Sequence, residues 1–139
     1  METLHYLLMK SHSVMQRKIY SEAQKIGLTS GQPKILDYLY EHEGSDQKTI
    51  AGYCEIEPAT LGSILLRMEQ KGLIERRQKN GNRRSWFVYL TENGKEVCEK
   101  MHDIFSQADE QAISGISPEK IQEVKNILTE ICRNLDRKD

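Results

Sequence analysis

The chain of 139 residues has a net charge of -1, and 37% of its residues are hydrophobic and 29% charged. This composition excludes a disordered chain and indicates one folded, helix-rich domain. No run approaches the ~18 apolar residues of a membrane span, and the first 20 residues lack the uninterrupted apolar core of a signal peptide, so we expect a cytoplasmic protein with no membrane partner.

Two helices are predicted in the N-terminal part of the chain. The first runs from Leu4 to about Gly27, with apolar residues at helical spacing and the glycine as its C-cap. The second has Pro33 near its start and Gly44 after its end. Its apolar face is expected to consist of Ile35, Leu36, Leu39 and Tyr40.

Residues 45–72 have the form of a helix-turn-helix. Ser45 or Asp46 caps a short helix, residues 55–57 form the turn, and Pro58 stands in the first turn of the next helix. That second helix has an apolar stripe at Leu61, Ile64, Leu65 and Met68. Its opposite face is suited to close contact with base edges in a major groove, although it could equally be an ordinary solvated surface; it carries Ala59, Gly62, Ser63, Leu66 and Gln70, flanked by Thr60 and Arg67.

A cationic β-hairpin is predicted directly after this helix. Residues 73–78 and 83–91 are strand-like, and Asn80-Gly81 between them is typical of a tight hairpin turn. Residues 67–84 contain seven Lys or Arg and two acids, a net charge of +5. The other 121 residues therefore carry a net charge of -6. Next to the second helix of the helix-turn-helix, such a hairpin can contact phosphates or enter a narrow minor groove of DNA. The cations at its tip are Lys79, Arg83 and Arg84.

Two further helices are expected to complete the chain. Thr91 caps the first, Gly115 interrupts the pattern, and Ser117 with Pro118 begins the last. Both helices carry apolar seams that a DNA-reading unit of residues 30–90 is too small to cover, so we predict packing against a second copy of the chain. A monomer with an intramolecular bundle is the alternative. The expected organisation is one integrated domain: a dimerisation helix in 1–29, a DNA-binding region in 30–90 and dimerisation helices in 91–139.

Nothing in the sequence indicates catalysis. Cys54, Cys98 and Cys132 are far apart and lack zinc-site spacing, so we interpret them as small buried side chains. The four histidines show no ligand-like local spacing, and no phosphate-binding loop or catalytic motif is present. We therefore expect no enzymatic activity, no cofactor and no metal site.

The order of these elements resembles the MarR family of winged-helix transcription factors. The most specific matches are "MEQKGLIER" at residues 68–76 and the "LTxxG" pattern from Leu90 to Gly94, and the resemblance covers nearly the whole chain. It implies a mainly α fold with a small β-hairpin wing, that is, a winged helix-turn-helix plus terminal dimerisation helices. It also implies a homodimeric transcriptional regulator, foremost a repressor, that binds pseudo-palindromic double-stranded DNA and is released by a small ligand or an oxidant.

The resemblance also implies which residues contact DNA. The base-contacting positions fall on Pro58, Ala59, Thr60, Ser63 and Arg67, and Arg84 corresponds to the minor-groove arginine of the wing. Asn82 stands where the family usually has an aspartate that holds this arginine, so that support lacks charge assistance.

By the same analogy, a ligand site is expected in the crevice between the dimerisation helices and the DNA-reading lobe. It would take a small aromatic or anionic molecule and be lined by Met9, Ser13, Arg17 and Tyr38. The oxidant-sensing branch of the family has its reactive cysteine in the first helix, and this first helix has none. The alternative function is a winged-helix interaction module whose basic wing binds an acidic protein.

Overall fold

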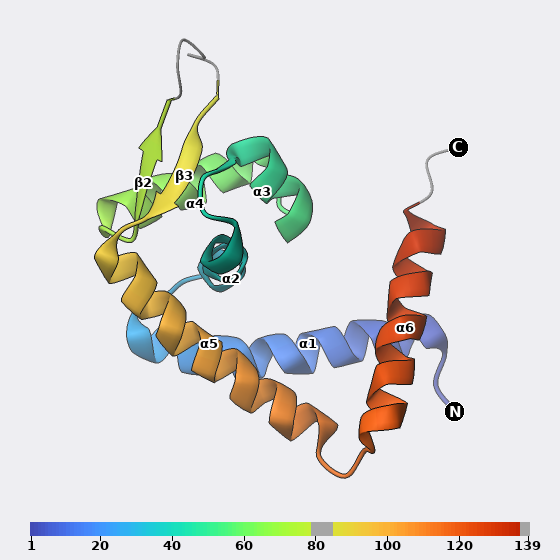
Figure 1. Ribbon diagram of the computed structural model, residues 1–139. Coiled ribbons are helices and arrows are strands. Elements are labelled where there is room, and N and C mark those ends of the chain that lie inside the picture. The colour runs from blue at the N-terminus through green and yellow to red at the C-terminus, as the bar shows by residue number, and fades with distance from the viewer. Residues whose placement is uncertain (79–84, 137–139) are drawn as a thin grey trace.

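The structure is a computed structural model that describes residues 1–78 and 85–136. A lobe containing the sheet sits at one end of the long helix α5, α1 packs across α5, and α6 stands apart (Figure 1). Among the described residues, no helix is long and apolar enough to cross a membrane. The elements in chain order are α1 (Leu4–Ala23), the 3-10 helix η1 (Gln24–Ile26), α2 (Gln32–His42), β1 (Ser45–Asp46), α3 (Gln47–Cys54), α4 (Pro58–Gln70), β2 (Ile74–Arg77), β3 (Phe87–Leu90), α5 (Glu92–Ile113) and α6 (Pro118–Leu135).

Local capping chemistry fixes the helix ends where the sequence predicts them. The carboxylate of Asp46 accepts a hydrogen bond from the Thr49 amide at 2.7 Å and so starts α3. Thr91 and Ser117 cap α5 and α6 in the same way, through bonds from the backbone amides three residues later. Gly27, with φ of 82°, follows the end of η1 in a left-handed conformation that glycine adopts without strain.

The sheet has three antiparallel strands in the order β1-β3-β2, one more than the predicted hairpin. Strands β2 and β3 pair Ile74 with Leu90 and Arg77 with Phe87, as expected for the two strands of the wing. The added strand β1 pairs Ser45 with Val88, next to a bond of 2.7 Å from the Gly44 amide to the Val88 carbonyl. The predicted turn at Asn80-Gly81 lies outside the described residues.

The core of the lobe is formed by α2, α3, α4 and β3. Its fully buried side chains include the predicted stripe of α4, except that Ile64 is only partly buried. The expected apolar face of α2 is wrong at one position: Tyr40 is 52% exposed, because it stacks on His102 of α5 instead of entering the core, and Tyr38 is buried. The large apolar side chains buried to under 2% exposure are Ile35, Leu36, Leu39, Ile50, Leu61, Leu65, Met68, Ile74, Val88 and Met101.

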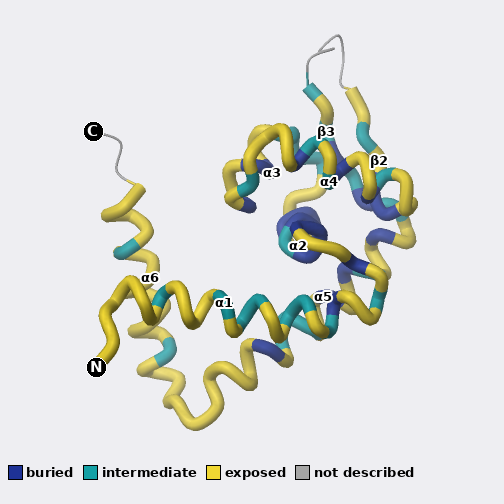
Figure 2. Tube along the Cα trace, turned by 180° about the vertical axis from the view of Figure 1, so that it is seen from behind, coloured by how far each residue is buried: buried dark blue, intermediate teal, exposed yellow. Residues whose placement is uncertain are grey.

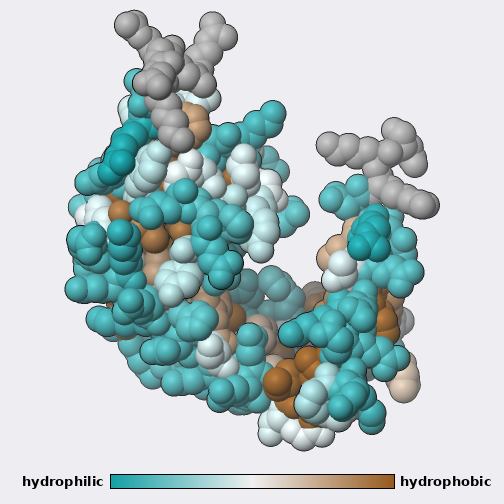
Figure 3. Space-filling model, in the orientation of Figure 1, coloured by the Kyte–Doolittle hydropathy of each residue, from teal (hydrophilic) through white to brown (hydrophobic). Residues whose placement is uncertain are grey.

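Helix α6 leaves its apolar seam uncovered. None of its 18 residues, all of which the structure describes, is buried. Figure 2 shows α6 and the start of α1 largely in the colour of exposed residues, and in Figure 3 brown hydrophobic groups gather at the base of the α6 arm. An exposed apolar surface of this extent on a folded chain marks an interaction site; its large members are Leu4, Leu7, Val14, Ile113, Ile116, Val124, Ile127, Leu128 and Leu135.

Candidate nucleic-acid interface

The second helix of the helix-turn-helix, α4, presents one face to the core and the other to solvent. Leu61, Leu65 and Met68 are fully buried and hold the helix against the lobe. The outward face carries short side chains near its start, so that another molecule can approach the backbone closely. The five residues predicted to contact bases are all exposed on this helix: Pro58, Ala59, Thr60, Ser63 and Arg67.

Ala59, Ser63 and Arg67 are spaced by four residues and therefore follow one line along α4. The Ser63 hydroxyl donates to the Ala59 carbonyl at 3.4 Å, a weak local bond that it can exchange for a base edge. Within residues 1–78 and 85–136, no hydrogen bond or ion pair engages the Arg67 guanidinium. This line combines a free cation with a hydroxyl, as a base-reading surface requires.

Three of the seven cations counted in residues 67–84 are occupied within the chain. Lys71 donates to the Gly27 carbonyl at 2.9 Å, Arg77 pairs with Glu75 at 2.9 Å, and Arg76 pairs with Glu69 at 3.1 Å. Glu69 and Glu75 are the two acids already subtracted in the count, and Lys71 keeps its charge beside a neutral carbonyl, so the net charge of +5 in residues 67–84 is unchanged. The wing residues Lys79, Arg83 and Arg84, with Asn82, lie outside the described residues.

Arg76 connects the wing to the recognition helix, a role that the sequence did not reveal. Its Nη2 and Nε atoms face the two carboxylate oxygens of Glu69 on α4, at 3.1 and 3.4 Å. Its Nη1 donates to Gln47 of α3 at 3.4 Å, and its Cζ lies 5.5 Å from the centre of the Trp86 ring. Such a two-point arginine–carboxylate pair fixes orientation, so these contacts set the position of strands β2 and β3 relative to α4.

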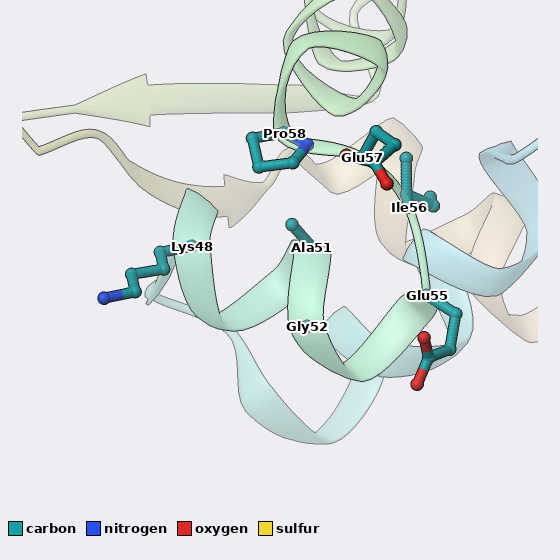
Figure 4. Close-up of a pocket in the computed structure, with 7 residues that line it drawn as sticks. All are labelled: Lys48, Ala51, Gly52, Glu55, Ile56, Glu57 and Pro58. Atoms are coloured by element: carbon teal, nitrogen blue, oxygen red, sulfur yellow. The ribbon is translucent and has the colours of Figure 1, made fainter. Parts of the chain in front are cut away.

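A hollow of about 400 Å³ lies at the turn of the helix-turn-helix, between α3 and the start of α4 (Figure 4). Pro58 forms one edge of it, and the Glu55 side chain points away from Pro58. Glu55 has φ of 54°, a left-handed conformation uncommon outside glycine, which makes the sharp turn between the helices. Its lining has two acids, Glu55 and Glu57, against one cation, Lys48, so its net charge does not attract an anion.

The pocket that Tyr38 lines does not bring together the four residues predicted to line a ligand crevice. Met9 is 52% exposed, and Ser13 and Arg17 follow it along α1. Tyr38 is buried on α2 and lines a pocket to which none of the three α1 residues contributes. A separate hollow of about 440 Å³ lies between α1 and α5, lined by Ser11, Val14, Met15, Lys18, Ala108, Gln111 and Ala112. The four predicted ligand residues stay a prediction.

The thiols differ in their surroundings, and the expectation that all three are buried is wrong for Cys132. That residue is exposed on α6, which packs against little of its own chain. Burial raises the pKa of the Cys98 thiol to about 11, helped by the negative charges of Asp37 and Glu43, and the thiol donates to the Leu36 carbonyl at 3.4 Å. Burial also raises the pKa of Cys54.

Cys98 is therefore expected to resist alkylation in the native protein. A thiol pKa about two above the unperturbed 9.0 lowers the thiolate fraction at pH 8 roughly 100-fold. Mass spectrometry of iodoacetamide-labelled peptides should show Cys98 modified at least that much more slowly than in urea-unfolded chain. Equal rates in the two states would contradict the burial of this thiol.

The geometry agrees with the comparisons to known proteins. The MarR family profile matches residues 28–86. The organic hydroperoxide resistance transcriptional regulator of Bacillus subtilis is 31% identical, over 98% of this chain and 91% of that protein. A MarR transcriptional regulator from Methanosarcina mazei is 27% identical with a TM-score of 0.82, covering 93% of this chain and 96% of its own.

Staphylococcus aureus MepR, in a complex with DNA, has a TM-score of 0.87 and 26% identity, and the match covers 96% of this chain and 99% of that one. The resemblance first read from the motifs at residues 68–76 and 90–94, and the predicted fold of helices with a small wing, are thereby confirmed. The chain belongs to the MarR family of winged-helix transcriptional regulators.

Proposed function

We propose that the chain controls transcription as a homodimer, in which two copies of α4 enter successive major grooves of a pseudo-palindromic operator. The observation that carries this proposal is the exposed line of Ala59, Ser63 and Arg67 on a helix whose other face is fixed in the core. In a two-fold dimer the two helices reach half-sites about one helical turn, ~34 Å, apart. Residues 30–90 then contact DNA, while residues 1–29 and 91–139 serve dimerisation.

The uncovered apolar surface of α1 and α6 supports the dimer. Val124, Ile127 and Leu128 are each more than 40% exposed in the single chain. Covering such side chains contributes roughly 25 cal/mol for each Å² removed from water, and closed two-fold dimers are the commonest way in which identical chains do so. We propose repression as the outcome, because a bound dimer occludes the duplex that it covers.

Variants of the recognition helix and the wing test this function. Arg84→Ala is expected to weaken binding to every sequence and to lower the slope of log affinity against log salt by about 1. Ser63→Ala and Arg67→Ala are expected to change base preference. Each should weaken the free energy of binding to DNA with the preferred base by about 1–3 kcal/mol. Gel shifts across a salt series, on the protein's own promoter region and on random duplex, measure both effects.

Lys100→Ala is the matched control, since this exposed lysine of α5 lies outside the proposed interface and its loss should leave both quantities unchanged. Equal affinity of the unaltered protein for promoter and random DNA would speak against specific regulation. If Arg84→Ala left the salt slope unchanged, the wing would not be part of the interface with DNA.

We propose that a small molecule releases the protein from DNA, and that neither Cys54 nor Cys98 acts as a hydroperoxide sensor. The relative from B. subtilis is named for organic hydroperoxide resistance. In this chain α1 has no cysteine, and Cys54 and Cys98 are buried with raised pKa values. The thiolate is the reactive form of a cysteine, so these two residues are poorly suited to react with an oxidant.

A further inference from the structure

A small pocket of about 190 Å³ lies where α2, α3 and α5 meet, and no residue of α4 lines it. Its lining is unusual in composition: three tyrosines, two histidines and two carboxylates, with no lysine or arginine. Helix α2 supplies most of these side chains, α3 supplies Tyr53, and α5 supplies His102. The volume is below that of a drug-sized site and suits a small ligand.

The aromatic rings stand in two groups around the pocket. Tyr38 makes edge contacts with His42 and with Tyr53, each with ring centres 4.7 Å apart. Tyr40 stacks on His102, with ring centres 6.0 Å apart and planes inclined by 20°. Yet Tyr53 is 71% exposed and Tyr40 is 52% exposed, so large parts of these rings are left uncovered by the chain.

The charge of the lining is negative. Asp37 and Glu41 are four residues apart on α2 and therefore lie on the same side of the helix. Burial raises the pKa of Asp37, and repulsion from Glu41 and Asp109 acts in the same direction, while His102 acts to lower it. A positive charge placed among these groups would stabilise the ionised carboxylates, whereas an anion would add to the repulsion.

We propose that this pocket binds a small organic cation of the ammonium type, with aromatic rings against its apolar surface and carboxylates balancing its charge. Aromatic side chains attract cations through the negative faces of their rings, and quaternary ammonium groups are recognised by such rings. A bare metal ion fits less well, because the described residues contain no group of three or more His, Cys, Asp or Glu placed to hold one. The ligand class differs from the aromatic or anionic molecule that the family resemblance implies.

The position of the pocket gives its occupant a way to affect DNA binding, a consequence that rests on the proposed function. The ligand would touch α3 of the helix-turn-helix and α5, which leads away from the sheet and is itself one of the proposed dimerisation helices. A cation that binds better to one spacing of these helices shifts the protein towards that spacing, by no more than its difference in affinity.

The binding itself is tested without DNA. Choline, its uncharged analogue 3,3-dimethyl-1-butanol, and salicylate are titrated separately into the full-length ¹⁵N-labelled protein, and two-dimensional NMR spectra are recorded. Choline is expected to shift the amide signals of Tyr53 and His102 in a saturable manner. The uncharged analogue is expected to bind at least about 3-fold more weakly, since it lacks the cation–π attraction.

Variants of exposed lining residues locate the site. Tyr53→Ala is expected to weaken choline binding about 2- to 30-fold, while Tyr53→Phe keeps the ring and the affinity. Glu41→Gln should weaken it as well, and Glu110→Gln on the exposed surface of α5 should not. Absence of choline binding, equal binding of the uncharged analogue, or unchanged affinity in Tyr53→Ala would overturn the proposal. Choline binding that leaves DNA affinity unaltered would overturn its regulatory consequence alone.

Discussion

Replacing Leu128 with glutamate is expected to convert the proposed dimer into monomers. Leu128 is 42% exposed in the single chain, and it lies one turn from Val124 and near Ile131 on the uncovered seam of α6. A carboxylate forced into an apolar interface without a partner costs several kcal/mol, roughly what a dimer contact of this kind contributes. Sedimentation or light scattering at micromolar concentration should report the mass of one chain.

Loss of the dimer should also abolish strong DNA binding. A dimer with two linked DNA-binding regions binds an operator with two half-sites roughly 10²- to 10⁴-fold more tightly than a single chain does. The DNA affinity of Leu128→Glu, measured by gel shift, should therefore fall by that factor. Asn126→Glu is the matched control: it adds the same charge on the opposite side of α6, where it should leave mass and affinity intact. A dimeric Leu128→Glu protein would place the interface elsewhere.

Gly94→Ala is expected to lower the free energy of unfolding by about 3 kcal/mol, the upper part of the range for overpacking. A Cβ on Gly94 would overlap the carbonyl oxygen of Leu73. That carbonyl cannot move aside freely, because it accepts a hydrogen bond of 3.1 Å from the Thr91 amide. Thr91 is itself held by a bond from its hydroxyl to the Gly72 carbonyl at 2.5 Å.

Urea unfolding followed by circular dichroism measures this loss. Gly52→Ala in α3 serves as the control, because its Cβ would meet no atom within 4 Å. Alanine is the better helix former by about 0.5–1 kcal/mol, so this variant should be slightly more stable than the unaltered protein. If Gly94→Ala unfolded at the same urea concentration as Gly52→Ala, the close approach of α5 to Leu73 would be disproved.

The contact between Gly94 and Leu73 explains in physical terms why the "LTxxG" pattern was informative in the sequence. Thr91 caps α5 through a bond from the Gly94 amide at 2.9 Å and holds the loop between α4 and β2, while glycine lets α5 approach that loop. Local signals of this kind depend on residues a few positions apart. They predicted the ends of the helices and both strands of the wing.

Features that depend on pairing between distant segments were not predictable. Strand β1 has two residues and forms only because β3, more than 40 positions later, offers its free edge. The Arg76–Glu69 pair joins a strand to a helix, and in the sequence both residues appear as members of a charged run. The sequence gives the number of cations in residues 67–84 but not which of them pair with acids of their own chain.

The ligand residues depend on the same kind of information. Met9, Ser13 and Arg17 were placed near Tyr38 by analogy and stay a prediction; within the single chain the Tyr38 ring contacts Tyr53 and His42. Which side chains border a cavity is set by the angles between helices, and no periodicity along one helix contains those angles. Exposure of Cys132 was missed for a related reason, because the seam of α6 finds no partner within its own chain.

The most direct test is to select bound duplexes from a random DNA pool with the purified protein. It shows whether two copies of α4 contact two half-sites of one operator. We predict enrichment of one pseudo-palindromic sequence, with half-site centres about 10 bp apart. Repeating the selection with Ser63→Ala should change the preferred base at one equivalent position in both halves. Enrichment of a single unrepeated motif, or a Ser63→Ala selection identical to that of the unaltered protein, would contradict the account.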